Sequence, residues 1–332
     1  MSAANNSPFK NGLHKFSPRK IPLFKKQTEE FPLSSVCFLP FKLDFYCNIC
    51  YNNAKTFYFD IIFLTGSGIM KYPILLVHGM GFRDDRPIGY WGRIPRKLKE
   101  NGFNVYLSGQ DSNGSIESNA RKVSESIDRI LKTENTDKVN IIAHSKGGLE
   151  ARYAASSLGC SEKIASITTL STPHNGSKTV DKLMKLPEGL IRFGCKATDL
   201  WFRLLGDKEP DTFRAICSFR TEDARRFNEQ NPDAETIYYQ SYAFVMKRIS
   251  SDMLMWLPSL IVRCFDGEND GLLSPESVKW ANFITGVGNR GISHCDEVDM
   301  RRMKLSSKQG SGVADISDFY VDIAKELEQM GF

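Results

Sequence analysis

The segment Val139-Asn-Ile-Ile-Ala-His-Ser-Lys-Gly-Gly148 joins an apolar run of strand length to a tight turn and a helix-forming sequence. A serine on such a strand-to-helix turn needs small residues two positions before and after it, because the strand and the helix approach each other closely there. Ala143 and Gly147 meet this need around Ser145. The segment therefore predicts a nucleophile elbow, with an ordinary serine in a tight turn as the alternative.

Strand and helix patterns alternate around this segment. Short apolar runs predict strands near residues 70–79, 104–107, 138–143 and 164–170, and again at 236–244 and 257–265. Apolar residues at helical spacing predict helices over residues 120–131, 147–155 and 316–330. This alternation, with short connections, is typical of a mostly parallel sheet that carries helices on both faces. We therefore expect one α/β domain over residues 70–332.

Residues 1–69 differ from the rest of the chain. They hold 13 aromatic residues and five prolines, and no helical or alternating period persists in them. They also hold 8 Lys and Arg against 4 Asp and Glu, a balance of +4, which leaves 36 against 35, or +1, for the remainder. We expect a poorly ordered N-terminal extension. Because the main domain is almost neutral, nucleic acid is not an expected partner.

Neither a membrane span nor an export signal is apparent. The best candidate span, Phe57–Leu64, is short and contains Asp60, and Met1–Lys20 lacks the apolar core of a signal peptide. Eight scattered cysteines suit a reducing compartment, and Cys47-Asn-Ile-Cys50 is a single CxxC without a nearby His. We therefore expect a cytoplasmic protein with no metal or redox chemistry at that pair.

The alternation of predicted strands and helices is interrupted between Ser177 and about Asp233. Residues 183–205 within this stretch are strongly apolar and predict helices. We expect a helical insertion over about residues 178–233 that covers the site as a lid or cap. A mobile lid needs apolar residues toward both lipid and site, but a static cap needs them equally.

A serine hydroxyl is a weak nucleophile unless a histidine and a carboxylate support it. His14 lies in the extension, and His78 and His174 follow expected strands. His144 is adjacent to the serine, so its side chain should leave the elbow in another direction. His294 remains as the best base.

The chain order serine, acid, histidine requires a carboxylate between Ser145 and His294. The segment Asn269-Asp-Gly-Leu272 offers Asp270 on a turn after an expected strand. Asp266, four residues earlier, is the competitor, and we prefer Asp270.

The turn His78-Gly-Met-Gly81 ends the first strong strand and can aim a backbone N–H at the site. The N–H groups of Met80 and Lys146 would then form an oxyanion hole. A phosphate-binding loop is the alternative, but the Gly-Lys-Ser/Thr of such loops is absent.

Seven separated segments together resemble the bacterial triacylglycerol lipase family, from about Met70 to the C-terminus. They are Tyr72-Pro-Ile-Leu-Leu-Val-His-Gly79, Tyr90-Trp91, Ala143-His-Ser-Lys-Gly-Gly-Leu149, Arg152-Tyr153, Ser171-Thr-Pro-His-Asn-Gly-Ser177, Asn269-Asp-Gly-Leu272 and His294-Cys-Asp-Glu-Val298. The resemblance implies an α/β-hydrolase fold, hydrolysis of acylglycerols or other fatty-acyl esters through an acyl-enzyme, and a helical lid that touches lipid transiently. The apolar residues 180–205 look like that lid.

Members of this family commonly hold a calcium ion that steadies the loop of the histidine. Asp296 matches one ligand position, whereas Asp252 is near the second position but out of register. No cofactor is expected to be required, and calcium would be structural. Two rival functions remain: an acyltransferase or thioesterase on the same fold, and a non-catalytic binding module, which a broken triad would mark.

Overall fold

The computed structural model describes residues 70–84, 89–286, 291–305 and 312–332. Contacts divide the chain into Met1–Thr65 and Gly66–Phe332, and all described residues belong to the second unit. The expected extension over residues 1–69, with its Cys47–Cys50 pair, therefore lies outside the described residues.

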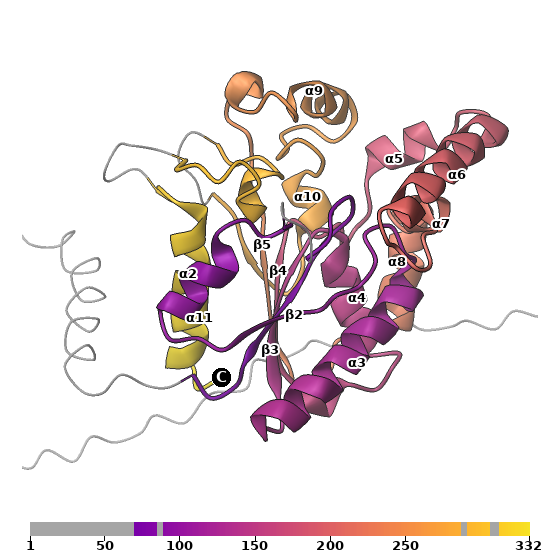
Figure 1. Cartoon of the computed structure of the whole chain (residues 1–332). Coiled ribbons are helices and arrows are strands. Elements are labelled where there is room, and N and C mark those ends of the chain that lie inside the picture. Colours follow the sequence, from indigo (N-terminus) through magenta and orange to yellow (C-terminus); the bar gives the residue numbers. More distant parts are fainter. Residues whose placement is uncertain (1–69, 85–88, 287–290, 306–311) are drawn as a thin grey trace, which may run out of the picture. The chain divides into compact units, whose positions relative to one another are not determined.

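A sheet of six strands runs through the described unit, and every neighbouring pair of strands is parallel (Figure 1). In spatial order the strands are β2 (Val105–Leu107), β1 (Ile74–Val77), β3 (Val139–His144), β4 (Ile164–Leu170), β5 (Tyr238–Tyr242) and β6 (Asn282–Ile284). The expected parallel sheet is confirmed. Because β3 lies between β1 and β4, the turn at Ser145 sits near the middle of the sheet's carboxyl edge.

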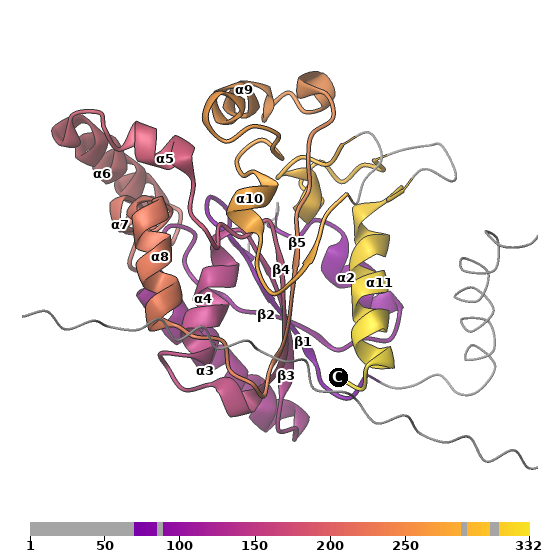
Figure 2. The ribbon, with the colours of Figure 1, turned by 180° about the vertical axis from the view of Figure 1, so that it is seen from behind.

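Helices cover both faces of the sheet, and each face has its own apolar core (Figures 1 and 2). Side chains of β1 alternate between the two cores: Ile74 and Leu76 belong to one, Leu75 and Val77 to the other. One core is covered by α2 (Ile94–Glu100) and α11 (Ile316–Gln329), and the other by α3 (Ile116–Glu134) and α4 (Lys146–Ala155).

Residues 178–233, all of which are described, contain four helices and no strand, as expected for the insertion. The helices are α5 (Lys178–Leu183), α6 (Glu188–Leu204), α7 (Thr212–Cys217) and α8 (Thr221–Gln230). Large apolar side chains of α6, among them Leu190, Phe193 and Leu204, are exposed. No helix in the described part of the chain is long and apolar enough to cross a membrane.

The strand expected over residues 257–265 is wrong, because this segment forms the helix α9 (Trp256–Phe265). A mostly apolar run fits a buried strand and a helix equally well, since its two polar residues, Ser259 and Arg263, are too few to establish a period. In the structure Leu257, Leu260 and Ile261 share an exposed helix face, and Val262 is buried. The short helix α10 (Pro275–Val278) and the edge strand β6 follow and were not expected.

The turn between β3 and α4 brings α4 directly against the end of β1. A Cβ added to Gly147 would collide with the carbonyl oxygens of Val77 and His78. A Cβ added to Gly79 would lie 2.7 Å from the Cβ of Ser145. Side chains do not approach so closely, so both positions require glycine.

Replacing Gly147 with alanine should lower the melting temperature by roughly 5 to 10 °C, because overpacking against fixed backbone costs about 2–3 kcal/mol. Gly194→Ala in α6 is the matched control, since nothing lies within 4 Å of a Cβ there. That variant should keep or slightly raise the melting temperature, because alanine favours the helix. Thermal unfolding followed by circular dichroism measures both, and equal melting temperatures would contradict the close approach.

Candidate active site

Ser145 occupies the turn at the carboxyl end of β3 and directly precedes α4. Its backbone angles, φ 53° and ψ −130°, lie in a region that L-residues rarely adopt. The Ser145 N–H donates to the carbonyl of Leu170 at 2.9 Å, and the Ser145 carbonyl accepts from the Thr172 hydroxyl at 2.8 Å. Such strain persists only where the surrounding structure enforces it, and it is concentrated at functional sites.

Asp270 and His294 come from the loops that follow α9 and β6. The Nδ1 atom of His294 lies 2.8 Å from Oδ2 of Asp270, and the His294 backbone N–H donates to the Asp270 carbonyl at 2.8 Å. These two hydrogen bonds fix one loop to the other. With Nδ1 bound to Asp270, Nε2 is the ring nitrogen available to act as a base.

The Asp270 carboxyl is fully buried, yet its pKa lies below the usual value. Burial acts to raise this pKa, but His294 and the backbone N–H groups of Leu272 and Leu273 more than offset it. Both N–H groups lie 2.8 Å from Oδ1. Asp270 therefore stays ionised and holds the imidazole in one orientation.

Asp266, the competing candidate for the acid of the triad, contacts α5 and not His294. Its carboxylate accepts hydrogen bonds at the start of α5 from the Thr179 N–H at 2.8 Å, from the Thr179 hydroxyl at 2.6 Å and from the Ser177 hydroxyl at 3.2 Å. Asp266 thus stabilises the first turn of α5, whereas the hydrogen bond to His294 comes from Asp270.

A buried hydrogen-bond network lies beside His294, and the sequence analysis did not predict it. The His144 ring does not leave the site, because its centroid lies 4.4 Å from that of His294. Its Nδ1 is 2.6 Å from the Tyr90 hydroxyl and its Nε2 is 3.0 Å from Oε2 of Glu297. The Ser171 hydroxyl donates to the other carboxyl oxygen at 2.9 Å. An acid three residues after the base was the sequence signal available for Glu297.

Burial favours the neutral form of each titratable member of this network. Burial, together with the neighbouring Asp270 carboxylate, raises the pKa of Glu297 well above its usual value. Burial and the nearby His294 lower the pKa of His144 well below its usual value, and burial raises the pKa of Tyr90. The network thus opposes the build-up of further charge beside the Asp270–His294 pair.

The two residues expected to supply the oxyanion hole lie on either side of the serine turn. Met80 follows β1 and lines the same cavity as Ser145, and Lys146 is the first residue of α4. The Lys146 side chain is fully buried: its Nζ donates to the Gly114 carbonyl at 2.8 Å and pairs with Glu150. Only the backbone of Lys146 is therefore available to a bound substrate.

Ser145, His144 and His294 border a cavity of about 570 Å³. The rest of its lining is mainly apolar. Two neighbouring helices supply part of it, with Val180 and Leu183 on α5 and Leu257, Ile261 and Val262 on α9, and loops and Ile216 of α7 supply the remainder. No residue of α6 lines it. The expected insertion thus contributes α5 and α7 to the walls of the cavity, whereas α9 lies outside that insertion.

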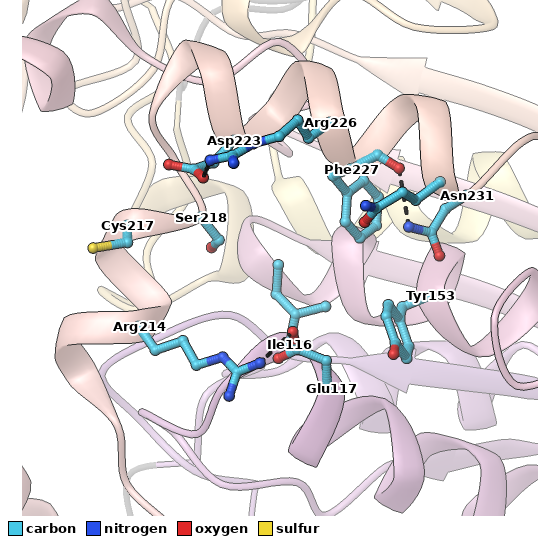
Figure 3. Close-up of a pocket in the computed structure, with 11 residues that line it drawn as sticks. Ile116, Glu117, Tyr153, Arg214, Cys217, Ser218, Asp223, Arg226, Phe227 and Asn231 are labelled. Carbon is cyan, nitrogen blue, oxygen red and sulfur yellow. Dashed lines mark hydrogen bonds and ion pairs between the residues drawn. The ribbon is translucent and has the colours of Figure 1, made fainter.

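A second cavity of about 330 Å³ lies between α3, α7 and α8 (Figure 3). Its charged groups neutralise one another: Arg214 lies 2.9 Å from Glu117, and Arg226 pairs with Asp223. None of the residues expected at the active site lines it. This cavity carries no group arranged for catalysis.

The residues at the expected calcium position do not fit a calcium ion. Arg301 donates to both oxygens of Asp296, from Nε at 2.8 Å and from Nη2 at 2.5 Å. Arg301 Nε also lies 4.0 Å from Asp252. Calcium requires six to eight oxygen ligands, and a guanidinium already neutralises the carboxylates here. Asp296, the possible calcium ligand that the resemblance implies, is thus paired with Arg301 in this structure.

One cluster among the described residues brings three metal-ligating side chains within 4.8 Å of one another: His144, His294 and Glu297. Both ring nitrogens of His144 already have hydrogen-bond partners, and Nδ1 of His294 binds Asp270. The cluster is therefore a hydrogen-bond network.

Comparisons with known proteins place the chain among lipases and related α/β-hydrolases in sequence. Residues 73–219 match the family model for palmitoyl protein thioesterase. The chain is 29% identical over 266 residues to triacylglycerol lipase 2 of Saccharomyces cerevisiae, covering 74% of this chain and 75% of that protein. It is 35% identical over 177 residues to a triacylglycerol lipase of Pseudarthrobacter phenanthrenivorans, covering 49% of this chain and 55% of that lipase, about half its length.

Solved structures share the fold at lower identity. The lipase of Staphylococcus hyicus superposes with a TM-score of 0.61 at 18% identity, covering 78% of this chain and 96% of that one. The metagenomic carboxyl esterase MGS0156 superposes with a TM-score of 0.60 at 16% identity, covering 80% and 78%. Both likenesses support the fold.

The network around Glu297 predicts a pH-dependent effect of Glu297→Gln. The folded protein keeps this acid protonated, whereas the unfolded chain ionises it above a pKa of about 4.3. The free energy of unfolding of the wild type should therefore fall as pH rises above that value, by up to about 1.4 kcal/mol per pH unit. The Glu297→Gln variant has no acid at this position and should not show this fall. The melting temperature of the variant minus that of wild type should increase from pH 5 to pH 8.

Glu162→Gln, on the surface after α4, is the control and should give a flat difference over the same range. A flat or falling difference for Glu297→Gln would show that Glu297 is ionised in the folded protein.

Proposed function

Because the chain is a serine hydrolase of the lipase family of α/β-hydrolases, we propose that it hydrolyses fatty-acyl esters through an acyl-enzyme on Ser145. The observation that carries this proposal is the buried Asp270–His294 pair, whose histidine lines the same apolar cavity as the strained Ser145. A base held by a carboxylate beside a serine is the arrangement that activates a hydroxyl.

Catalysis proceeds in two halves. Nε2 of His294 takes the Ser145 proton as the serine oxygen bonds to the ester carbonyl carbon, and Asp270 stabilises the imidazolium. The carbon–oxygen bond to the alcohol then breaks, and His294 gives its proton to the departing alkoxide. In the second half His294 takes a proton from water as the water oxygen bonds to the acyl carbon. The bond from that carbon to the Ser145 oxygen then breaks, His294 returns the proton to this oxygen, and the acid is released.

We assign the oxyanion hole to the backbone N–H groups of Met80 and Lys146. Met80 lies next to Gly79, whose lack of a side chain lets this loop approach Ser145. Lys146 begins α4, where the helix dipole favours negative charge. Two such donors stabilise the tetrahedral intermediate by several kcal/mol.

The substrate class follows from the lining of the cavity. Its walls from α5 and α9 present aliphatic side chains, and burial of methylene groups against them contributes about 0.8 kcal/mol per CH₂. We therefore propose acyl chains of medium or long length, as in acylglycerols.

We also propose that the protein is cytoplasmic. The free thiols of the five described cysteines support this compartment, because it is reducing.

We also propose that α5 and α9 form the mobile cover of the site and touch the lipid surface. Leu257 and Ile261 on α9 and Leu183 on α5 line the cavity and are also exposed to solvent. An exposed apolar rim around an apolar cavity fits a surface that meets lipid.

A thioesterase is the second candidate, because residues 73–219 match the palmitoyl protein thioesterase model. The same serine, base and oxyanion hole would cleave a thioester by the same steps. Rates on p-nitrophenyl palmitate and on an S-palmitoyl peptide, measured with one enzyme preparation, separate the two functions. A kcat/KM at least tenfold higher on the thioester would favour the thioesterase.

Ser145→Ala and His294→Ala should each lower kcat on p-nitrophenyl butyrate by roughly 10³-fold or more without changing the melting temperature greatly, because the triad acts as a unit. Asp270→Asn should lower kcat by roughly 10⁴-fold, since the amide selects the wrong tautomer. Asp266→Asn is the control and should affect stability more than kcat. More than a tenth of wild-type activity in Ser145→Ala would defeat the assignment.

Chain-length preference tests the role of α9. Leu257→Ser together with Ile261→Ser should reduce kcat/KM on a palmitoyl ester at least tenfold more than on a butyryl ester, because only the long chain reaches these walls. Leu190→Ser with Phe193→Ser on α6 is the control, since both side chains are exposed and neither lines the cavity. A p-nitrophenyl ester series measures the ratio, and equal losses on both esters would argue against the proposed cover.

A further inference from the structure

Arg301 lies between two segments that are far apart in the sequence. Its guanidinium donates to both oxygens of Asp296 and, from Nη1, to the Ser251 carbonyl at 3.0 Å. Nε also lies 4.0 Å from Oδ2 of Asp252. Arg301 thus joins the segment of residues 251–252, which follows β5, to the loop that carries His294.

The two carboxylates need a cation. Asp252 and Asp296 are 1% and 4% exposed, and both are hydrogen-bonded to the same residue, Ser293. The Ser293 hydroxyl donates to Asp252 at 2.5 Å, and the Asp296 N–H donates to that hydroxyl at 3.1 Å. Two buried carboxylates around one serine would repel each other strongly without a compensating positive charge.

Ser293 connects this cluster to catalysis, because the next residue is His294. The position of the base therefore depends on Ser293, and Ser293 depends on the two carboxylates. From the other side, Asp270 holds His294 through its carboxylate and its carbonyl. The loop is fixed at both ends, once by the acid of the triad and once by the Arg301 cluster.

We propose that the Arg301 guanidinium serves as the built-in cation of the His294 loop, in the place where relatives with calcium would use a metal ion. Arg301 is a positioning residue, which acts on the reaction through Asp252, Asp296 and Ser293. The protein consequently needs no divalent metal to keep His294 in place. The kinetic part of this inference rests on the proposed ester hydrolysis, whereas the stability part does not.

The first test uses the wild-type full chain. Treatment with EDTA, and addition of calcium chloride afterwards, should change neither the melting temperature nor kcat on p-nitrophenyl butyrate. A loss of either with EDTA that calcium restores would overturn the proposal.

The second test uses Arg301→Ala, with Arg302→Ala as the matched control on the adjacent, exposed arginine. Arg301→Ala should lower the melting temperature by roughly 5 °C and lower kcat roughly 10- to 100-fold at nearly unchanged KM, because a small displacement of the base impairs proton transfer but leaves the cavity intact. Calcium at millimolar concentration should recover part of both losses in this variant only, because it supplies the missing charge. Wild-type values in metal-free Arg301→Ala, or losses that calcium leaves untouched, would overturn the proposal.

A third variant keeps the test decisive if Arg301→Ala folds poorly. Arg301→Lys retains the charge but loses the two-pronged hydrogen bonds, so its melting temperature and kcat should fall between those of wild type and Arg301→Ala. The double variant Asp296→Asn with Arg301→Gln removes one charge of each sign. Its loss of melting temperature should be smaller than the sum of the losses in the two single variants. Simple additivity would contradict the pairing. Because melting temperature is read without substrate, failure of the ester assay alone would count against the proposed function and leave this inference standing.

Discussion

Ser145 has backbone angles that an L-residue adopts only under constraint, and the constraint comes from the ends of the two neighbouring strands, β4 and β1. β4 accepts its N–H through Leu170, Thr172 binds its carbonyl, and the end of β1 packs against Gly147. A parallel sheet supplies these contacts because neighbouring strands end at the same edge. The catalytic groups then need only loops long enough to reach this one fixed hydroxyl, and Asp270 and His294 arrive on such loops.

Most of the fold was predictable because its strands are short, apolar and buried on both faces. β1 reads as an uninterrupted apolar run, and β3 and β4 are apolar runs broken only by a few polar residues that are themselves buried; each strand is where the pattern places it. α9 was not predictable for a related reason: its exposed face is also largely apolar, so Ser259 and Arg263 alone do not reveal a helical period in Trp256–Phe265. The three-residue strand β6 is too short for any period to show.

At the site, Ser145, Asp270 and His294 could be predicted because their motifs are local and their order in the chain is constrained. Partners formed by folding alone could not. The position of His144 next to the serine gives no sign of its partners, and only the fold places its ring against Tyr90 and Glu297. Nothing in the sequence connects Asp252 with Arg301, which are 49 positions apart. In such cases a distant contact, rather than a motif, determines the role of the residue.

Phe332 and the catalytic serine lie at opposite edges of the sheet, which matters for attaching the protein to a surface. The carbonyl of Phe332 accepts a hydrogen bond from the Lys71 N–H at 3.2 Å, just before β1 begins, so the last described residue lies at the amino edge of the strands (Figures 1 and 2). Ser145 lies at the carboxyl edge. A protein immobilised on a solid support through Phe332 would therefore hold its substrate cavity toward the solution, which is the orientation that a reusable bead-bound catalyst or a sensor surface requires.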